Sequence, residues 1–161
     1  MSREPEPFPG QFPGTIAVPP DLPQLVEASD LVCLVRVVGL AEEGAAAYLV
    51  GDGEMEFNRV VAHAEVERVF NGAPAESVDV EFLRLDLPSS LARLDEGERA
   101  VLFLRRRDGR YGLVDPSTAK IPVDRVDEQT RRALLEARDG AAGEVARIAT
   151  EILSAIAVTP G

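Results

Sequence analysis

Three side chains of metal-ligand type, His63, Glu65 and Glu67, occupy alternate positions of one segment. Alternate side chains of a β-strand project from one face, about 6–7 Å apart, so these three could share a divalent ion if their rotamers converged. The same pattern is typical of a solvated strand face paired with Arg59, Arg68 or arginines of a neighbouring strand, which is the interpretation we favour. The sequence leaves a metal site and a paired polar face as alternatives.

A second group of charged side chains surrounds a turn signal, Asp108-Gly109. Arginine forks suit phosphate groups and carboxylates, so this group could contact a phosphate or an acidic protein. Alternatively, its charge keeps an edge hairpin soluble or pairs with the chain's own carboxylates. The group consists of Arg105, Arg106, Arg107 and Arg110.

Residues for covalent or cofactor-dependent catalysis are scarce in this chain. The sequence has no HExxH, GxSxG, Gly-rich phosphate loop or dinucleotide-binding pattern, and His63 is its one histidine. Cys33 is the one cysteine, which excludes an internal disulfide, and it lies in an apolar run where we expect a buried small hydrophobe. Asp52, Glu54 and Glu56 lack the frame of an EF-hand and predict an acidic loop. We therefore expect no enzyme activity and no cofactor.

Net charge restricts the partners. The 161 residues carry 17 basic and 28 acidic side chains, a net charge of −11, which repels nucleic acid and anionic lipid. Binding of a single strand also needs aromatic side chains on which bases stack, and this chain has no Trp, two Tyr and six Phe. Only residues 99–125 are basic, so weak single-strand binding is the one nucleic-acid alternative. Lys120 is the single lysine, a bias that suggests a GC-rich, bacterial source.

Targeting signals are lacking. The N-terminus, MSREPEPFPGQFPG, has neither the basic start nor the continuous apolar stretch of a signal peptide. No segment approaches the roughly 18 apolar residues that cross a bilayer. If Met1 is the native start, we expect a cytoplasmic protein without a membrane span; if a leader has been removed, we expect a secreted one.

Period-two alternation predicts strands in the centre of the chain. Residues 31–40 are apolar on both faces and predict a central strand, residues 78–82 predict a half-buried strand, and residues 100–104 and 111–114 predict a hairpin. Residues 41–56 are rich in glycine and acidic residues and predict a long, mobile hairpin connection. A further strand is expected over residues 59–70, with one buried face formed by Val60, Ala62, Ala64, Val66 and Phe70.

The two ends of the chain differ from the centre. Seven of the twelve prolines fall within residues 1–23, which predicts an extended or disordered arm. Residues 22–29 predict one or two helical turns, and Asp127 is expected to cap a helix that is followed by a second one over residues 143–157. The last helix carries an apolar stripe that either docks on the sheet or mediates self-association or partner binding. Its members include Ile148, Ile152 and Ile156.

Strands first and helices last predict an α+β fold: a small antiparallel β-barrel of five or six strands with a proline-rich N-terminal arm and two C-terminal helices. The expected divisions are the arm at residues 1–23, the barrel at 24–125 and the helical segment at 126–161.

Three segments carry a family resemblance: ASDLVCLVRVVGL at Ala28–Leu40, AHAEVERVFNG at Ala62–Gly72 and LDEGERAVLFLRRRDGRYGLVDPSTAKIPV at Leu94–Val123. They are similar to a widespread bacterial domain with an OB-type barrel, often compared with the inhibitory domain of tissue inhibitors of metalloproteinases and with netrin-like modules. The resemblance covers about 60% of the chain and implies that the expected fold is a small antiparallel OB-like β-barrel. Those inhibitors chelate zinc through a free N-terminal cysteine, whereas Cys33 is internal, so protease inhibition is not implied.

We interpret the chain as a non-catalytic protein-interaction or assembly module whose partner is another protein or a second copy. The arm and the last helix are the segments expected to hold that partner. The alternatives are a small-ligand or divalent-metal binding module and a weak single-stranded nucleic-acid binder.

Overall fold

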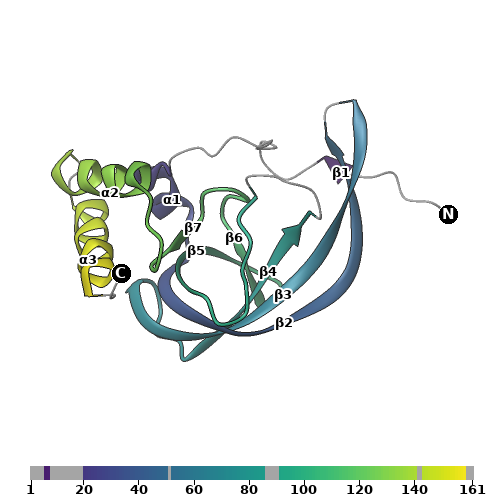
Figure 1. Ribbon diagram of the computed structural model, residues 1–161, viewed down its shortest axis with the longest axis horizontal. Helices are drawn as coiled ribbons and strands as arrows, with labels where there is room; N and C mark the ends of the chain where they lie inside the picture. Colours follow the sequence, from purple (N-terminus) through teal and green to yellow (C-terminus); the bar gives the residue numbers. More distant parts are fainter. Residues whose placement is uncertain (1–5, 8–19, 51, 86–90, 141–142, 159–161) are drawn as a thin grey trace.

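The computed structural model describes residues 6–7, 20–50, 52–85, 91–140 and 143–158, which form one seven-stranded sheet and three helices (Figure 1). The predicted α+β class is confirmed. In chain order the elements are β1 (Glu6–Pro7), α1 (Leu22–Ala28), β2 (Leu31–Val50), β3 (Gly53–Asn71), β4 (Ser77–Arg84), β5 (Arg99–Arg107), β6 (Arg110–Leu113), β7 (Lys120–Pro122), α2 (Glu128–Gly140) and α3 (Glu144–Val158).

Five of these strands close into a ring of backbone pairing. β2 pairs with both β3 and β5, β3 pairs with β4, β4 with β6, and β6 with β5. Most pairs are antiparallel, as predicted, but the β4–β6 and β1–β2 pairs are parallel. β7 adds to β5 and is not predicted by the sequence, because it contains Pro122 and proline is rare inside strands.

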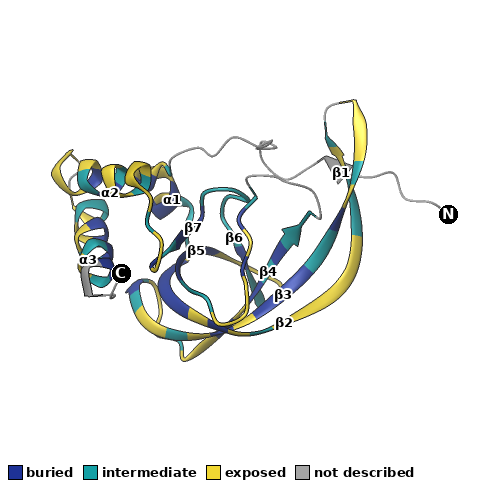
Figure 2. Cartoon of the chain, viewed as in Figure 1, coloured by how far each residue is buried: buried dark blue, intermediate teal, exposed yellow. Residues whose placement is uncertain are grey.

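β2 separates two apolar cores, because successive side chains of a strand point to opposite faces. The inner core lies inside the ring, and the outer core lies between the sheet and the helices; the dark blue of buried residues follows this part of β2 in Figure 2. The side chains that β2 directs inward are Leu31, Cys33, Val35 and Val37. Those that it directs outward are Val32 and Leu34. The prediction of a central strand that is apolar on both faces is confirmed.

The helices gather at one end of the molecule and pack on the outer side of β2, β5 and β7 (Figure 1). The Asp21 carboxylate accepts a hydrogen bond from the Gln24 amide at 3.2 Å and so caps α1. Asp127 caps α2 in the predicted way, accepting from the Thr130 amide at 2.7 Å. All three helices begin and end within two residues of their predicted bounds.

The largest correction concerns the predicted mobile connection at residues 41–56, because residues 41–50 and 53–56 are strand. The β2–β3 pairing continues from the ring until Val50 lies opposite Gly53. We call residues 38–50 and 53–58 the ribbon, which is largely exposed (Figure 2). Residues 45–50 pair with residues 53–58, whereas residues 39–42 pair with residues 60–63 of β3 at the ring. Because most side chains of the ribbon are in contact with solvent, its sequence lacks the alternation that signals a half-buried strand.

A second correction concerns the end of β3. The pairing with β2 skips Glu67 and Phe70, so the strand is bulged twice, and Phe70 is the extra residue of the second bulge, outside the regular alternation of the strand. Phe70 therefore packs in the outer core beneath the helices, while Val60, Ala62 and Ala64 line the inner core. The prediction that Phe70 shares their face is wrong.

Most of the predicted arm, residues 1–23, lies outside the described residues. Its described parts are Glu6–Pro7, which form β1 and pair with Tyr48 and Leu49 of β2, and residues 20–23. Leu22 is 1% exposed and belongs to the outer core, so α1 begins inside the predicted arm.

We expect Ile152→Ala to destabilise the fold by about 2–5 kcal/mol, because Ile152 is 0% exposed in the outer core and its truncation leaves a cavity. Val38→Ala is the control: this side chain is 44% exposed, and the expected change is below about 0.5 kcal/mol. Urea denaturation followed by circular dichroism measures both free energies of unfolding. Equal losses in the two variants would show that α3 does not complete the core.

Candidate functional site

The predicted metal ligands His63, Glu65 and Glu67 lie on the exposed face of β3, where two of them contact side chains of other strands. His63 Nδ1 is 2.8 Å from Asp79 Oδ1 on β4. Glu67 accepts a hydrogen bond from Arg99 Nε on β5 at 2.9 Å, at one of the bulges, and Glu65 is exposed. Among the described residues, no group of three or more His, Cys, Asp and Glu is arranged to hold a metal. The contacts are those of a paired polar face, and a metal site stays a prediction.

The four arginines of the β5–β6 hairpin do not converge on one point. Arg110 donates to both Glu43 carboxylate oxygens, at 2.5 and 2.9 Å, and Arg105 donates to the Ala28 carbonyl at 3.4 Å. The side chains of Arg106 and Arg107 are exposed and form no ion pair with the rest of the described chain. For Arg110 the predicted pairing with the chain's own carboxylates is confirmed. A phosphate or acidic-protein contact of this hairpin stays a prediction.

The isoleucine stripe of α3 is internal. Ile148, Ile152 and Ile156 are at most 6% exposed and belong to the outer core, so the first of the two predicted alternatives, docking on the sheet, is confirmed. Arg147 reinforces this docking by donating to the Phe70 carbonyl of β3 at 3.1 Å. Binding of a partner through these three side chains stays a prediction.

Two ion pairs fasten the base of the ribbon to the ring, and the sequence did not reveal them because their members lie 42 and 67 residues apart. They are Glu42 with Arg84 and Glu43 with Arg110 (2.5 Å). The hydrogen bond from Arg110 lowers the pKa of the Glu43 carboxyl, and the same contact raises the pKa of Arg110. Within the ring, Glu81 pairs with Arg59 (2.9 Å) and with Arg110 (3.8 Å).

The ribbon presents a strand edge together with exposed apolar side chains. β2 pairs with β5 only as far as Arg36, and from Val38 to Ala47 its backbone pairs with β3 alone among the described residues. The large apolar side chains that are exposed in the described chain all belong to β2: Val38 at 44%, Leu40 at 36% and Leu49 at 42%. A strand edge of this kind is a template on which another extended segment can pair.

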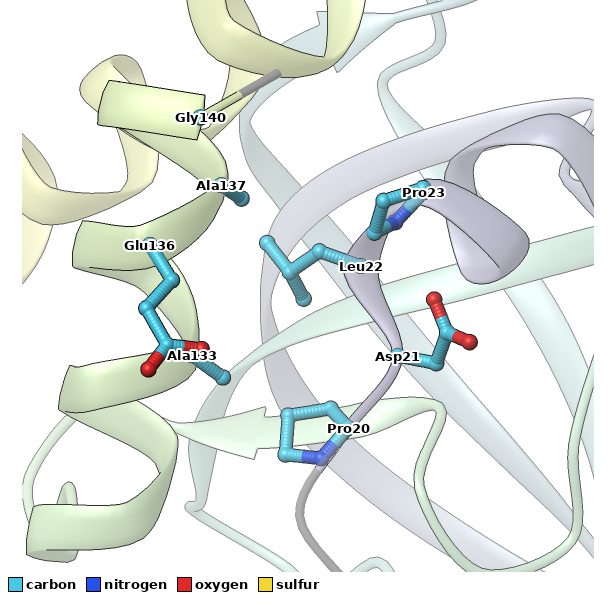
Figure 3. Close-up of a pocket in the computed structure, with 8 residues that line it drawn as sticks. All are labelled: Pro20, Asp21, Leu22, Pro23, Ala133, Glu136, Ala137 and Gly140. Atoms are coloured by element: carbon cyan, nitrogen blue, oxygen red, sulfur yellow. The ribbon is translucent and has the colours of Figure 1, made fainter.

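A shallow groove of about 410 Å³ lies between α1 and α2. Figure 3 shows Leu22 reaching toward α2, while the carboxylate of Asp21 points away from it. Asp21 is already engaged in capping α1, so the groove does not gather polar groups onto one point. Its lining consists of Pro20, Asp21, Leu22, Pro23, Ala133, Glu136, Ala137 and Gly140.

Cys33 is a buried thiol of the inner core, as predicted. It is 0% exposed, and burial raises its pKa from 9.0 to about 12. The thiol is therefore fully protonated at neutral pH, which is the unreactive form.

The described residues contain no helix long and apolar enough to cross a membrane. Comparison of the sequence with protein-family models and with curated proteins finds no match.

We expect Cys33 of the folded protein to react with Ellman's reagent at pH 8 at least about a hundredfold more slowly than in urea, because the thiol is both buried and protonated. Absorbance at the thiolate product's wavelength follows the reaction. A native rate equal to that of a free thiol would contradict this burial.

We expect the pKa of Glu43, measured by NMR titration, to lie below its ordinary value of 4.5 and to return toward that value in Arg110→Gln. A carboxyl whose pKa is lowered by folding stabilises the fold at pH values above its ordinary pKa. This contribution is lost as the pH falls through the folded-state pKa. Arg125→Gln, outside this network, is the control and should leave Glu43 unchanged. An ordinary Glu43 pKa in the unsubstituted protein would show that the contact does not form in solution.

Proposed function

We propose that this chain is a non-catalytic protein-interaction or assembly module built on an OB-like barrel. The observation that carries the proposal is the exposed β2 edge of the ribbon with Val38, Leu40 and Leu49 beside it.

The order of strands in the ring supports the OB-like assignment. Counted from β2, the five ring strands pair in the order first, second, third, fifth, fourth and back to the first. The third and fifth, β4 and β6, are the parallel pair. A ring of five strands that is mostly antiparallel agrees with the five-stranded Greek-key barrel of OB folds. The resemblance of Ala28–Val123 to bacterial OB-type domains agrees with the same assignment.

The ribbon supports an interaction role because it adds little to the cores. Of its residues only Phe57 is buried, and Phe57 packs edge-on against Tyr48 within the ribbon, with ring centroids 5.6 Å apart. A projecting strand pair with apolar side chains in solvent costs free energy unless a partner covers it. Binding to another protein explains why such a surface is kept.

The placement of the chain's two candidate reactive side chains supports a non-catalytic role. Cys33 lies inside the ring as a protonated thiol. His63 contacts Asp79 on the exposed face of β3, and it lines neither the groove between α1 and α2 nor the pocket beside Ser117 and Thr118. A general base acts on a group held within hydrogen-bond reach, which normally requires a pocket beside it.

The test is capture of partners from a lysate of the source cells by the immobilised protein, together with light scattering of the purified protein. We expect one or more proteins, or a second copy, to be retained by the unsubstituted chain. The double variant Val38→Lys/Leu49→Lys should retain at least about tenfold less partner than the unsubstituted chain, because two charges replace apolar contacts at the edge.

The matched control is Gln129→Lys/Ser154→Lys, which adds the same charge at exposed positions of α2 and α3. It should retain the partner as the unsubstituted protein does. A monomer that retains nothing, or retention that survives the edge substitutions unchanged, would contradict the proposed function.

A further inference from the structure

The β2 edge already accepts one extended segment near the tip of the ribbon. Glu6–Pro7 of β1 pair in parallel with Tyr48 and Leu49. Figure 1 shows β1 beside the ribbon at the end of the molecule opposite the helices. Toward the ring, the edge continues from Val38 to Ala47, a length of roughly 30 Å that exceeds an ordinary strand of about 5–6 residues.

β1 fits this edge poorly. It has two residues, and Pro7 has no backbone N–H with which to donate to the ladder. Residues 38–58 hold five acidic side chains and no basic one. A longer segment of positive charge would make more backbone hydrogen bonds than β1 and would be attracted to this charge.

The charge of the ribbon indicates the chemistry of that segment. Asp52, Glu54 and Glu56 are exposed and form no ion pair with any described residue. In the β2–β3 pairing Glu54 lies opposite Leu49, and Glu56 lies opposite Ala47. Residues directly opposite each other share one face, so the two carboxylates lie on the same face as the exposed Leu49 and one strand away from the β2 edge.

We propose that the β2 edge of the ribbon binds an extended basic segment of a partner protein as an added strand, in which lysine or arginine alternates with apolar residues. β1 occupies the end of this edge until that segment displaces it. The inference rests on the proposed function and specifies its binding mode. A second copy is the poorer occupant, because each copy carries a net charge of −11 and the same acidic ribbon.

The probe is a capped twelve-residue peptide of alternating lysine and valine, titrated into the full chain and followed by calorimetry and by amide chemical shifts. We expect shifts confined to residues 38–58 and β1, and no binding of the matching peptide of glutamate and valine. Glu54→Lys/Glu56→Lys should weaken binding by at least about tenfold, since it reverses the two unpaired charges beside the edge.

Two further variants sharpen the test. Glu76→Lys/Glu128→Lys makes the same change of net charge at exposed positions outside the ribbon, and it should alter the affinity by no more than about twofold. Removal of residues 1–7 takes away the competing strand and should tighten binding by about threefold or more.

The inference would be overturned if the ribbon variant and the control variant lost equal peptide affinity, or if the shifts centred away from the ribbon. A dimer in which a second copy covers this edge would also overturn it. If the peptide does not bind but partner capture still depends on Val38 and Leu49, the inference falls and the proposed function stands. If capture is also absent, both fall.

Discussion

The architecture depends on the first part of β2, where one strand supplies side chains to two cores. Cys33, with its inward neighbours, closes the inside of the strand ring, while Val32 and Leu34 form the surface on which the helices pack. Backbone pairing with β3 on one side and β5 on the other holds this segment at the centre of the sheet. Because the helices bury the outer face and the ring buries the inner one, neither core can form without the strand that they share.

Past Arg36 the same strand has a different environment. β5 ends its pairing there, the helices lie at the other end of the molecule, and the chain continues as the ribbon. Ion pairs such as Glu43 with Arg110 fix the base of the ribbon to the ring, but contribute little free energy at these exposures. Among the described residues the outer ribbon is therefore held mainly by its β2–β3 hydrogen bonds, and only β1 pairs with its other edge.

Features encoded by local alternation or capping were predictable from the sequence. The apolar run at residues 31–37, the cap at Asp127 and the stripe of Ile148 and Ile152 all lie where their patterns indicated. The ribbon was missed because pairing without burial leaves no periodic signal. The changed face of Phe70 depends on bulges, and the separation of the hairpin arginines depends on partners distant in the chain, such as Glu43. These features are set by tertiary pairing, which short-range patterns do not contain.

The central claim is that β2 is divided into a buried half and a half with an open edge that an extended basic segment can cover. Residue-resolved amide hydrogen exchange tests it directly. The amides of Leu31–Arg36 should exchange only on global unfolding, whereas amides of Val38–Ala47 that face away from β3 should exchange rapidly and become protected when the lysine and valine peptide is added. Slow exchange along all of Val38–Ala47 in the free protein, or no added protection with the peptide, would contradict the claim.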